Sequence, residues 1–263
     1  FNVGYTYGWG QGLLRGRNLN APVNGRRPES AFANVVSLVP DAEAKSHAVN
    51  VGWNLTLLEW KRAFLFANYT WSKSDTNTTG AFSLPANGDN LATEWGPSSG
   101  DVRHRASFQM SMTPVTNLSV SVNARAQSGS PYNITTGRDD NGDGLFSDRP
   151  AGTSRNSART AAQWDLGGRV SYAWGLGTRS QGGGLGGGTT VVMGGGGGGA
   201  MAPGFGGGAA DKRFRIEVYA SAQNLLNRAN YVGYSGVMTS QFFGQPTSVM
   251  NPRRVQLGVR FGF

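Results

Sequence analysis

The chain has 263 residues, of which 15% are charged and 38% hydrophobic, with 41 glycines, no cysteine and a formal net charge of +9. This length suits one large all-β domain or two ordinary domains, and the absence of cysteine excludes a disulfide scaffold and thiol chemistry. No stretch approaches the roughly 20 consecutive apolar residues that a membrane helix needs, which excludes a helical membrane protein but not a membrane barrel.

Apolar and polar residues alternate in eight segments of about ten residues each. In the last of them, Val255, Leu257, Val259, Phe261 and Phe263 alternate with polar residues or glycine. A period of two is typical of a strand with one apolar and one polar face. The sequence therefore predicts eight strands, which in chain order are 1–9, 49–57, 63–72, 104–112, 118–127, 164–174, 213–223 and 255–263.

The connections between these segments alternate in length. The chain turns within a few residues near 58–60 and 114–116, whereas the segments after Trp9, Ser72, Gln127 and Asn224 run for roughly 25 to 35 residues. An up-and-down barrel of the outer membrane has short periplasmic turns and long external loops. We therefore expect the long connections to be external and the last strand to end at the periplasmic rim.

Aromatic residues gather near the strand ends on the apolar face, where membrane barrels carry aromatic girdles. The alternative is that strands favour aromatic residues in general. The opposite face carries Asn, Gln, Ser, Thr, Arg and Glu, which suit a wet lumen better than a packed core. These patterns predict an all-β, antiparallel, up-and-down transmembrane β-barrel located in the cell outer membrane. The girdle residues are Tyr7, Trp9, Tyr69, Trp71, Tyr172 and Trp174.

Four longer strings resemble the C-terminal barrel of TonB-dependent outer-membrane receptors, and among these the Oar-like branch, which has a carboxypeptidase-regulatory-like domain at its N-terminus. The resemblance implies a 22-stranded barrel, an N-terminal plug, and energy-coupled uptake of a solute driven by the TonB complex. It also implies that the terminal Phe263 is the signal that the barrel-assembly machinery reads. The strings are "RNLNAP", "GAFSLPANGDNLATEWGPSSGDVRHR", "SGSPYNITTGRDDNGDGLFSDRPAGTSRNSAR" and "QNLLNRANYVGYSGVMTSQFFGQPTSVMNPRRVQLGVRFGF".

The sequence departs from that family because only about eight strands are present, without a plug or a TonB-binding segment. We therefore expect residues 1–263 to be the C-terminal portion of one larger barrel domain. An open eight-stranded sheet would leave two unpaired edges in lipid. The alternative is a self-contained eight-stranded barrel that closes on itself and acts as an anchor or adhesin without transport.

The third long connection contains "DDNGDGLFSD", in which oxygen-bearing side chains alternate before Gly144. This is the first half of a calcium-loop pattern, in which alternate oxygens converge on one hard cation. The twelfth position is Pro150 instead of a bidentate glutamate, so we predict a calcium site with fewer ligands, and the alternative is a turn without metal. The candidate ligands are Asp139, Asn141, Asp143 and Asp148.

The segment 182–208 has 16 glycines in 27 residues and no periodicity, so it is predicted to be a flexible insertion. A phosphate-binding loop is not expected there because no strand-to-helix pattern follows. By the alternation of connections, this insertion falls on the periplasmic side.

Many charged residues fall on the predicted lumen face or at loop bases. They could grip a plug or an anionic solute, or they could form ordinary cross-strand pairs with Asp165 and Glu217. Arg26, Arg27 and Arg138 suit acidic head groups of outer-membrane lipid and lipopolysaccharide, whereas nucleic acid is not an expected partner. The lumen charges are Arg103, Arg105, Arg125, Asp165, Arg169, Arg213, Arg215, Glu217 and Arg260.

Aromatic residues in the long connections are candidates for first contact with an unknown solute, and the alternative is that they pack against one another. No catalytic constellation is present around His47 or His104, so we expect no enzyme activity, and no cofactor is required apart from the calcium considered above. The ligand-contact candidates are Trp95, Tyr132, Tyr231, Tyr234, Phe242 and Phe243.

Overall fold

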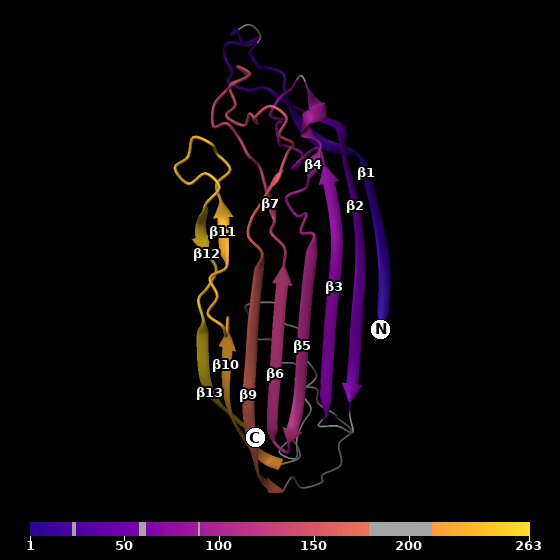
Figure 1. The fold of residues 1–263 in the computed structure, drawn as a ribbon, viewed down its shortest axis with the longest axis vertical. Coiled ribbons are helices and arrows are strands. Elements are labelled where there is room, and N and C mark those ends of the chain that lie inside the picture. Colours follow the sequence, from indigo (N-terminus) through magenta and orange to yellow (C-terminus); the bar gives the residue numbers. More distant parts are fainter. Residues whose placement is uncertain (23–24, 58–61, 89, 179–211) are drawn as a thin grey trace.

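A single antiparallel sheet dominates the computed structural model, which describes residues 1–22, 25–57, 62–88, 90–178 and 212–263. Its long strands follow one another in sequence order, so that each pairs with the next long strand along the chain (Figure 1). This is the predicted up-and-down topology. The long strands are β1 (Asn2–Asn18), β2 (Val36–Leu57), β3 (Ala63–Thr76), β5 (His104–Val115), β6 (Leu118–Gln127), β9 (Gln163–Thr178), β10 (Lys212–Gln223) and β13 (Arg254–Gly262).

Short elements lie in the long connections, at one end of the sheet. Strand β4 (Gly96–Pro97) pairs with β3, β7 (Pro131–Tyr132) pairs with β8 (Ala158–Arg159), and β11 (Tyr231–Tyr234) pairs with β12 (Pro246–Val249). The 3-10 helix η1 (Leu91–Glu94) lies just before β4. None of the described helices is long and apolar enough to cross a bilayer. The predicted glycine-rich insertion, 182–208, lies outside the described residues.

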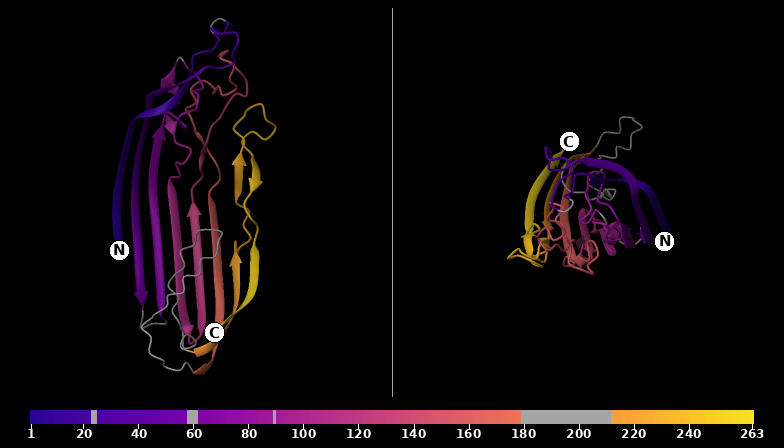
Figure 2. Two further views of the ribbon diagram at one scale, coloured as in Figure 1. Left: turned by 180° about the vertical axis from the view of Figure 1, so that it is seen from behind. Right: turned by 90° about the horizontal axis from the view of Figure 1, so that it is seen from above.

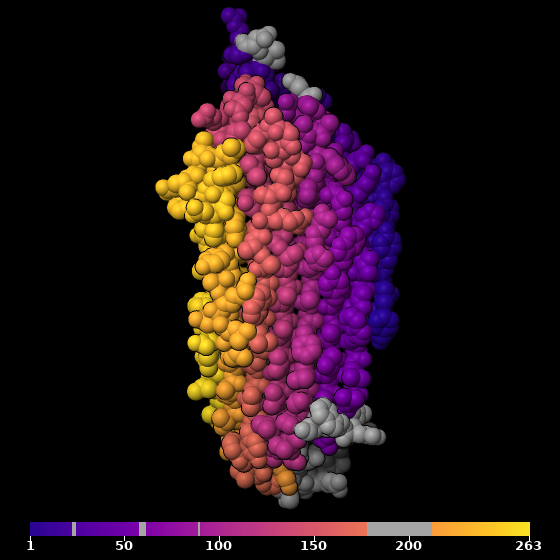
Figure 3. Space-filling view, in the orientation of Figure 1, coloured from indigo at the N-terminus to yellow at the C-terminus, as the bar shows by residue number. Residues whose placement is uncertain are grey.

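The sheet curves into an open wall (Figure 2). Its two edge strands, β1 and β13, do not pair with each other within the described residues. In the space-filling view the strands form parallel bands ordered by sequence from one edge to the other, and the long connections rise above them at one end (Figure 3). This shape is that of one part of a barrel wall.

The wall has almost no apolar core of its own. The buried hydrophobic residues of the described chain are four alanines and Val102, whereas large apolar side chains stand exposed along one face. Leu257 and Val259 of β13, for example, are 76% and 70% exposed. A soluble protein rarely leaves so much contiguous apolar surface in water, so this face needs an apolar environment. Other members of the face are Val3, Tyr5, Tyr7, Trp9, Trp53, Leu55, Val170, Tyr172, Trp174, Val218 and Phe261.

The first two strands extend well beyond the predicted segments 1–9 and 49–57. The prediction of a long loop directly after Trp9 was wrong, because β1 continues to Asn18 and pairs with the first part of β2, with register shifts between Gly10 and Arg15. These extensions lack a clean apolar alternation because both of their faces are free to meet water or loops. Hydrophobic periodicity reports burial or lipid contact, so it does not mark such a strand.

Candidate functional site at the long-loop end of the sheet

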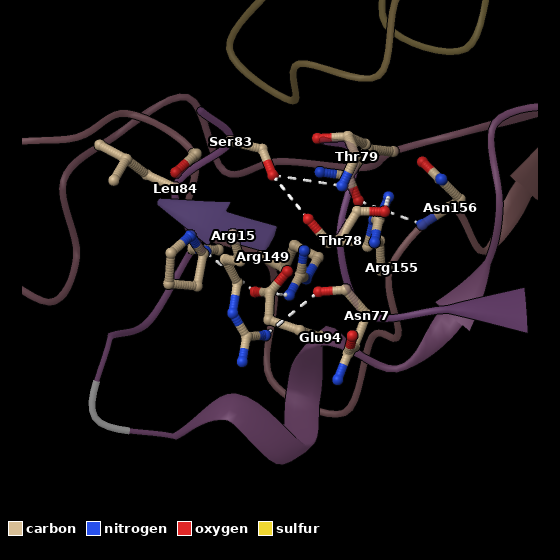
Figure 4. A pocket seen from close by; sticks show the side chains of 14 residues that line it. Arg15, Asn77, Thr78, Thr79, Ser83, Leu84, Glu94, Arg149, Arg155 and Asn156 are labelled. Carbon is tan, nitrogen blue, oxygen red and sulfur yellow. Dashed lines mark hydrogen bonds and ion pairs between the residues drawn. The ribbon is translucent and has the colours of Figure 1, made fainter. Parts of the chain in front are cut away.

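Three segments that are distant in sequence enclose a small cavity at the long-loop end (Figure 4). They are the end of β1, the β3–β5 connection and the β6–β9 connection, and the cavity measures about 150 Å³. Hydroxyl groups line much of it: those of Thr78, Thr79 and Ser83 from the β3–β5 connection and that of Ser147 from the β6–β9 connection. The lining is therefore polar and rich in hydrogen-bonding groups.

Arg15 forms the β1 side of this cavity and is almost fully buried, with 3% of its side chain exposed. Its Nη2 and Nε donate to Asp41 Oδ1 on the neighbouring strand β2 at 2.7 and 3.1 Å. Its Nη1 donates to the backbone oxygen of Asn77 at 3.2 Å. The charge of Arg15 is thus balanced by one carboxylate.

A second ion pair joins the two connections across the cavity. Arg149 of the β6–β9 connection donates to Glu94 Oε1 and to the backbone oxygen of Thr93, and both side chains of the ion pair are 6% exposed. Glu94 Oε1 also accepts the backbone N–H of Ala86 at 2.9 Å. Such a buried pair is retained only where hydrogen bonds satisfy both partners, and here these bonds fix the positions of η1 and of both connections.

Arg155 is the third cation of the lining and is 5% exposed. Its Nη1 and Nη2 donate to the backbone oxygens of Thr76 and Thr78 at 3.3 and 2.9 Å, at the end of β3. Burial lowers the pKa of Arg155 below its usual range; the nearby charge of Glu94 acts in the opposite direction and that of Arg149 lowers it further. No ion pair of Arg155 with a carboxylate occurs in the described chain.

The backbone of Arg155 lies directly against β4. A Cβ atom added to Gly96 would come closer than 3.0 Å to the Arg155 carbonyl oxygen, and Asn156 donates from its side chain to the Pro97 oxygen at 2.8 Å. Only glycine allows this approach without a shift of the backbone. The sequence thus places a glycine at a point where the two connections come into close contact.

A second buried carboxylate lies at the base of the same connections. The side chain of Asp101 is fully buried; its Oδ1 accepts the N–H of Ser74 at 2.8 Å, and its Oδ2 accepts from Arg103 at 2.9 Å and from Arg159. Burial by itself raises the pKa of Asp101, but these hydrogen bonds and the charge of Arg103 outweigh it, so the pKa lies below its usual range. Asp101 therefore links β3, the start of β5 and the β6–β9 connection.

The polar face of the sheet carries a row of charged side chains that continues below this region. Glu217 on β10 pairs with Arg169 of β9 at 3.0 Å and with Arg215 of its own strand at 3.6 Å. The guanidinium of Arg169 also lies 3.9 Å from the centre of the Tyr219 ring. That ring covers Gly258 of β13, where a Cβ atom would collide with it. Charged and aromatic groups thus cover one face, and apolar side chains cover the other.

The family model of the outer membrane beta barrel domain matches residues 1–174. The chain belongs to this family. The fold also resembles that of the outer membrane transporter YddB from Escherichia coli, with a TM-score of 0.57 and 12% sequence identity, over 98% of this chain and 29% of that chain. At this identity the likeness concerns the fold alone, and the chain spans less than a third of the transporter's length. No curated protein matches the chain.

Membership in the outer membrane beta barrel family indicates what each face of the sheet contacts. The domain lies in the outer membrane, so the exposed apolar face meets lipid and the charged face meets the barrel interior. The long connections then form the external rim and the short turns the periplasmic rim. The cavity of Arg15, Arg149 and Arg155 lies among these external loops (Figure 4).

The predicted lumen charges occupy different surroundings in this outer-membrane barrel wall. Arg169, Arg215 and Glu217 form the ion-pair cluster, and Arg103 joins Asp101 instead, above the strands. Two further arginines lie opposite carboxylates on neighbouring strands: Arg125 is opposite Asp165 in the β6–β9 register, and Arg260 is opposite Glu217 in the β10–β13 register. Arg105 donates a hydrogen bond to the Gly100 oxygen at 3.3 Å. The guanidinium of Arg213 lies 5.2 Å from the centre of the Phe214 ring. Cross-strand pairing is therefore present, and a role in gripping a plug or solute stays a prediction.

The predicted ligand-contact aromatics divide into two groups. Tyr132 and Tyr234 pack against each other, with ring centres 5.8 Å apart, and the Nζ of Lys45 lies 5.7 Å from the centre of the Trp95 ring. The contact between Tyr132 and Tyr234 matches the alternative in which loop aromatics pack together. The more accessible ones are Tyr231, Phe242 and Phe243, which are between 41% and 49% exposed.

The candidate calcium ligands accept hydrogen bonds from their own loop. Asp139 Oδ2 accepts the N–H of Gly144 at 2.9 Å, and Asp148 Oδ2 accepts those of Asp140 and Asn141. Oxygen atoms of Asn141 and Asp143 accept further N–H groups two residues ahead. No group of three or more His, Cys, Asp or Glu side chains in the described residues is arranged to hold a metal. The calcium site stays a prediction.

One detail of the loop still favours a cation. Asp139 Oδ1 is buried without a hydrogen-bond partner. Burial raises the pKa of Asp143, hydrogen bonds from Leu145 and Asn141 oppose this rise, and the charges of Asp148 and Asp139 add to it. The carboxylates are therefore near enough to repel one another.

The structure also shows where the terminal Phe263 and the two histidines lie. Phe263 is 98% exposed at the end of β13, on the periplasmic rim, with its ring 6.2 Å from that of Phe261. A hydrogen bond of 2.7 Å joins the Tyr69 hydroxyl to Nδ1 of His104, and one of 2.8 Å joins the Tyr5 hydroxyl to Nδ1 of His47. The backbone N–H of His104 donates to the Ser128 hydroxyl at 3.1 Å.

The sequence pattern did not point to Arg15, Glu94, Arg149 or Arg155. The three arginines lie in segments without periodicity, and their burial arises from contacts between distant connections. An unusual density of arginine in residues 149–159 was the one local signal available.

Proposed function

We propose that the chain forms part of the barrel of a TonB-dependent outer-membrane receptor that binds a solute at its external loops and takes it up with energy from the TonB complex. The observation that carries this proposal is the pair of unpaired edges, β1 and β13. In hydrocarbon each unpaired backbone group costs several kcal/mol, so further strands must complete the wall. A wall larger than eight strands leaves room for a lumen and a plug.

The charged inner face supports this function. A barrel of eight strands is filled by its own side chains, whereas Arg169, Glu217 and Arg215 form a polar surface suited to a wet lumen or to a polar plug. The Oar-like strings at the external loops favour the same kind of receptor. The bound solute would be one that is too large or too scarce for porin diffusion.

The second candidate is a self-contained eight-stranded barrel that serves as an anchor or adhesin. It requires β1 to pair with β13, and these strands are separate edges in the described structure. The open wall therefore favours the larger receptor.

The length of the native product provides the first test. Outer-membrane fractions of the source cells are blotted with an antibody against this chain, and we expect a band several times larger than 27.8 kDa. A band at that mass which shifts on boiling would show that eight strands close alone, and the receptor proposal would then be wrong.

Energy coupling needs a separate test. Photo-cross-linking in cells between the full-length protein and TonB should give an adduct that disappears when the segment preceding this chain is deleted. A full-length protein that inserts normally but never cross-links to TonB would contradict energy coupling while leaving the barrel assignment intact.

A further inference from the structure

The cavity among the external loops contains more positive than negative charge. Arg15 is balanced by Asp41 and Arg149 by Glu94, whereas Arg155 has only backbone oxygens as partners. The carboxylate of the adjacent Asp148 accepts N–H groups of its own loop. Glu94, whose charge also acts on Arg155, is directly paired with Arg149, so Arg155 has no carboxylate of its own at ion-pair distance among the described residues. Proteins seldom bury an unpaired charge, because removing it from water costs several kcal/mol.

Donor groups in the same cavity remain unused. Of the nitrogen atoms of Arg149 and Arg155, Nε and Nη1 of Arg149 and Nε of Arg155 have no hydrogen-bond partner in the described chain. None of them is sealed from solvent, because among the described residues Asp139 Oδ1 is the only fully buried side-chain nitrogen or oxygen atom without a partner. Arginine N–H groups form a planar fork that matches the oxygens of carboxylate and phosphate groups.

The size of the cavity limits what it can hold. Its volume of about 150 Å³ is smaller than the roughly 300 Å³ or more of pockets that enclose a whole drug-sized ligand. It is large enough for several water molecules at about 30 Å³ each. It therefore suits one polar group of a larger molecule, with the rest of that molecule in the lumen or above the loops.

We propose that this cavity binds a single oxyanion group, a carboxylate or a phosphate, whose oxygens accept from Arg149 and Arg155 and from the hydroxyls of Thr79 and Ser147. The proposal deepens the receptor function and rests on it for its biological meaning, since it gives the solute an anionic group. The same chemistry is offered by the phosphates of lipopolysaccharide. The bound group would give Arg155 the direct ion pair that it lacks in the described chain.

The test uses the full-length protein, purified in detergent and freed of lipopolysaccharide, and titrates it with inorganic phosphate at constant ionic strength. We expect saturable binding and a rise in the unfolding temperature that chloride does not give, because a ligand of the native state stabilises it. No saturable phosphate binding, or an equal effect of chloride, would overturn the proposal.

Matched variants place the binding in the cavity. Ser147→Asp puts a carboxylate beside the arginines and should weaken phosphate binding by about tenfold or more, because like charges repel at short range. Ser147→Asn has nearly the same shape as Ser147→Asp but no charge, so it should bind phosphate about tenfold or more tightly than Ser147→Asp. Equal affinities of the two variants would show that phosphate binds elsewhere.

A second pair of variants keeps the test valid if the Ser147 variants misfold. Thr79 is exposed at the surface side of the cavity, so Thr79→Glu and Thr79→Gln repeat the comparison from the other connection. We expect the glutamate variant to bind phosphate about tenfold or more weakly than the glutamine variant, and equal affinities or the reverse order would contradict the proposal. No energy source is present in the titration, so its failure leaves TonB coupling untouched, and failure of the TonB cross-link leaves the titration valid.

Adding purified lipopolysaccharide separates the two sources of oxyanion. Competition with inorganic phosphate in the wild type and in Ser147→Asn assigns the cavity to the lipid's phosphates. Phosphate binding that is unaffected by lipopolysaccharide assigns it to a soluble solute.

Discussion

Arg159 donates hydrogen bonds to both the backbone oxygen and the carboxylate of Asp101, and so ties the β6–β9 connection to the β3–β5 connection. The carboxylate is fully buried, whereas Arg159 and Arg103 are about one-third exposed. The partially exposed cations can find water, but the buried carboxylate cannot. The ionised carboxylate of Asp101 is therefore stabilised in the folded protein by the hydrogen bonds that it accepts.

Replacement of Asp101 by asparagine should loosen both connections. Two charge-assisted bonds are weakened, so we expect a loss of about 2–4 kcal/mol in stability. The measurement is urea unfolding of the full-length protein in detergent micelles, followed by tryptophan fluorescence. Asp140→Asn, at an exposed loop position, is the matched control and should change stability by less than about 0.5 kcal/mol.

The same carboxylate gives a pH dependence with a defined sign. The pKa of Asp101 in the folded state lies below its unfolded value, so ionised Asp101 contributes stability above the unfolded pKa of about 3.9. This contribution is lost as the pH falls from about 4 through the folded pKa. We expect unfolding temperatures of the wild type to drop in that range more than those of Asp101→Asn. Parallel pH profiles would contradict this assignment.

Gly96 offers a test of the contact between β4 and Arg155. The added methyl group of Gly96→Ala would collide with the Arg155 carbonyl oxygen, so we expect a cost of about 1–3 kcal/mol and weaker phosphate binding. Gly100→Ala is the control, because no atom lies within 4 Å of its added Cβ. Unfolding and phosphate titration of the two variants make the comparison. Equal stability of both would show that the connections separate easily at this point.

The calcium prediction is tested by calorimetric titration. We expect weak binding, with a dissociation constant of about 10⁻⁴–10⁻³ M, as in extracellular calcium modules. Asp143→Ala should abolish it, whereas Asp140→Ala, whose side chain is not a predicted ligand, should leave it unchanged. Asp143 Oδ1 also accepts the N–H of Leu145, which leaves the other lone pairs of the carboxylate for a cation. Absence of heat with the wild type would end the calcium hypothesis.

Strand placement could be predicted wherever one face meets lipid. The segment 104–112, for instance, lies within β5, and its alternation follows from lipid on one side and water on the other. The upper parts of β1 and β2 could not be found in this way, because water or loops meet both faces there. Their pairing depends on backbone hydrogen bonds, which leave no mark on side-chain type.

The candidate site could be predicted only in outline. Aromatic loop residues were correctly placed in the long connections, but the packing of Tyr132 against Tyr234 joins positions about 100 residues apart. The burial of Arg155 likewise depends on how the β6–β9 connection folds over the end of β3. Such long-range contacts need the register of the whole sheet, which a local pattern does not contain.

The length of β2 sets how far the long connections stand from the membrane. Its 22 residues span roughly 70 Å at about 3.3 Å per residue, whereas the apolar band of an outer-membrane barrel is only about 25 Å tall. Arg15 follows the girdle residue Trp9 by six positions on β1, which raises it roughly 15 Å above the lipid surface on a tilted strand. The arginine cavity thus stands clear of the lipid, and under the proposed receptor function a captured molecule would have to descend past the membrane plane before it enters the cell.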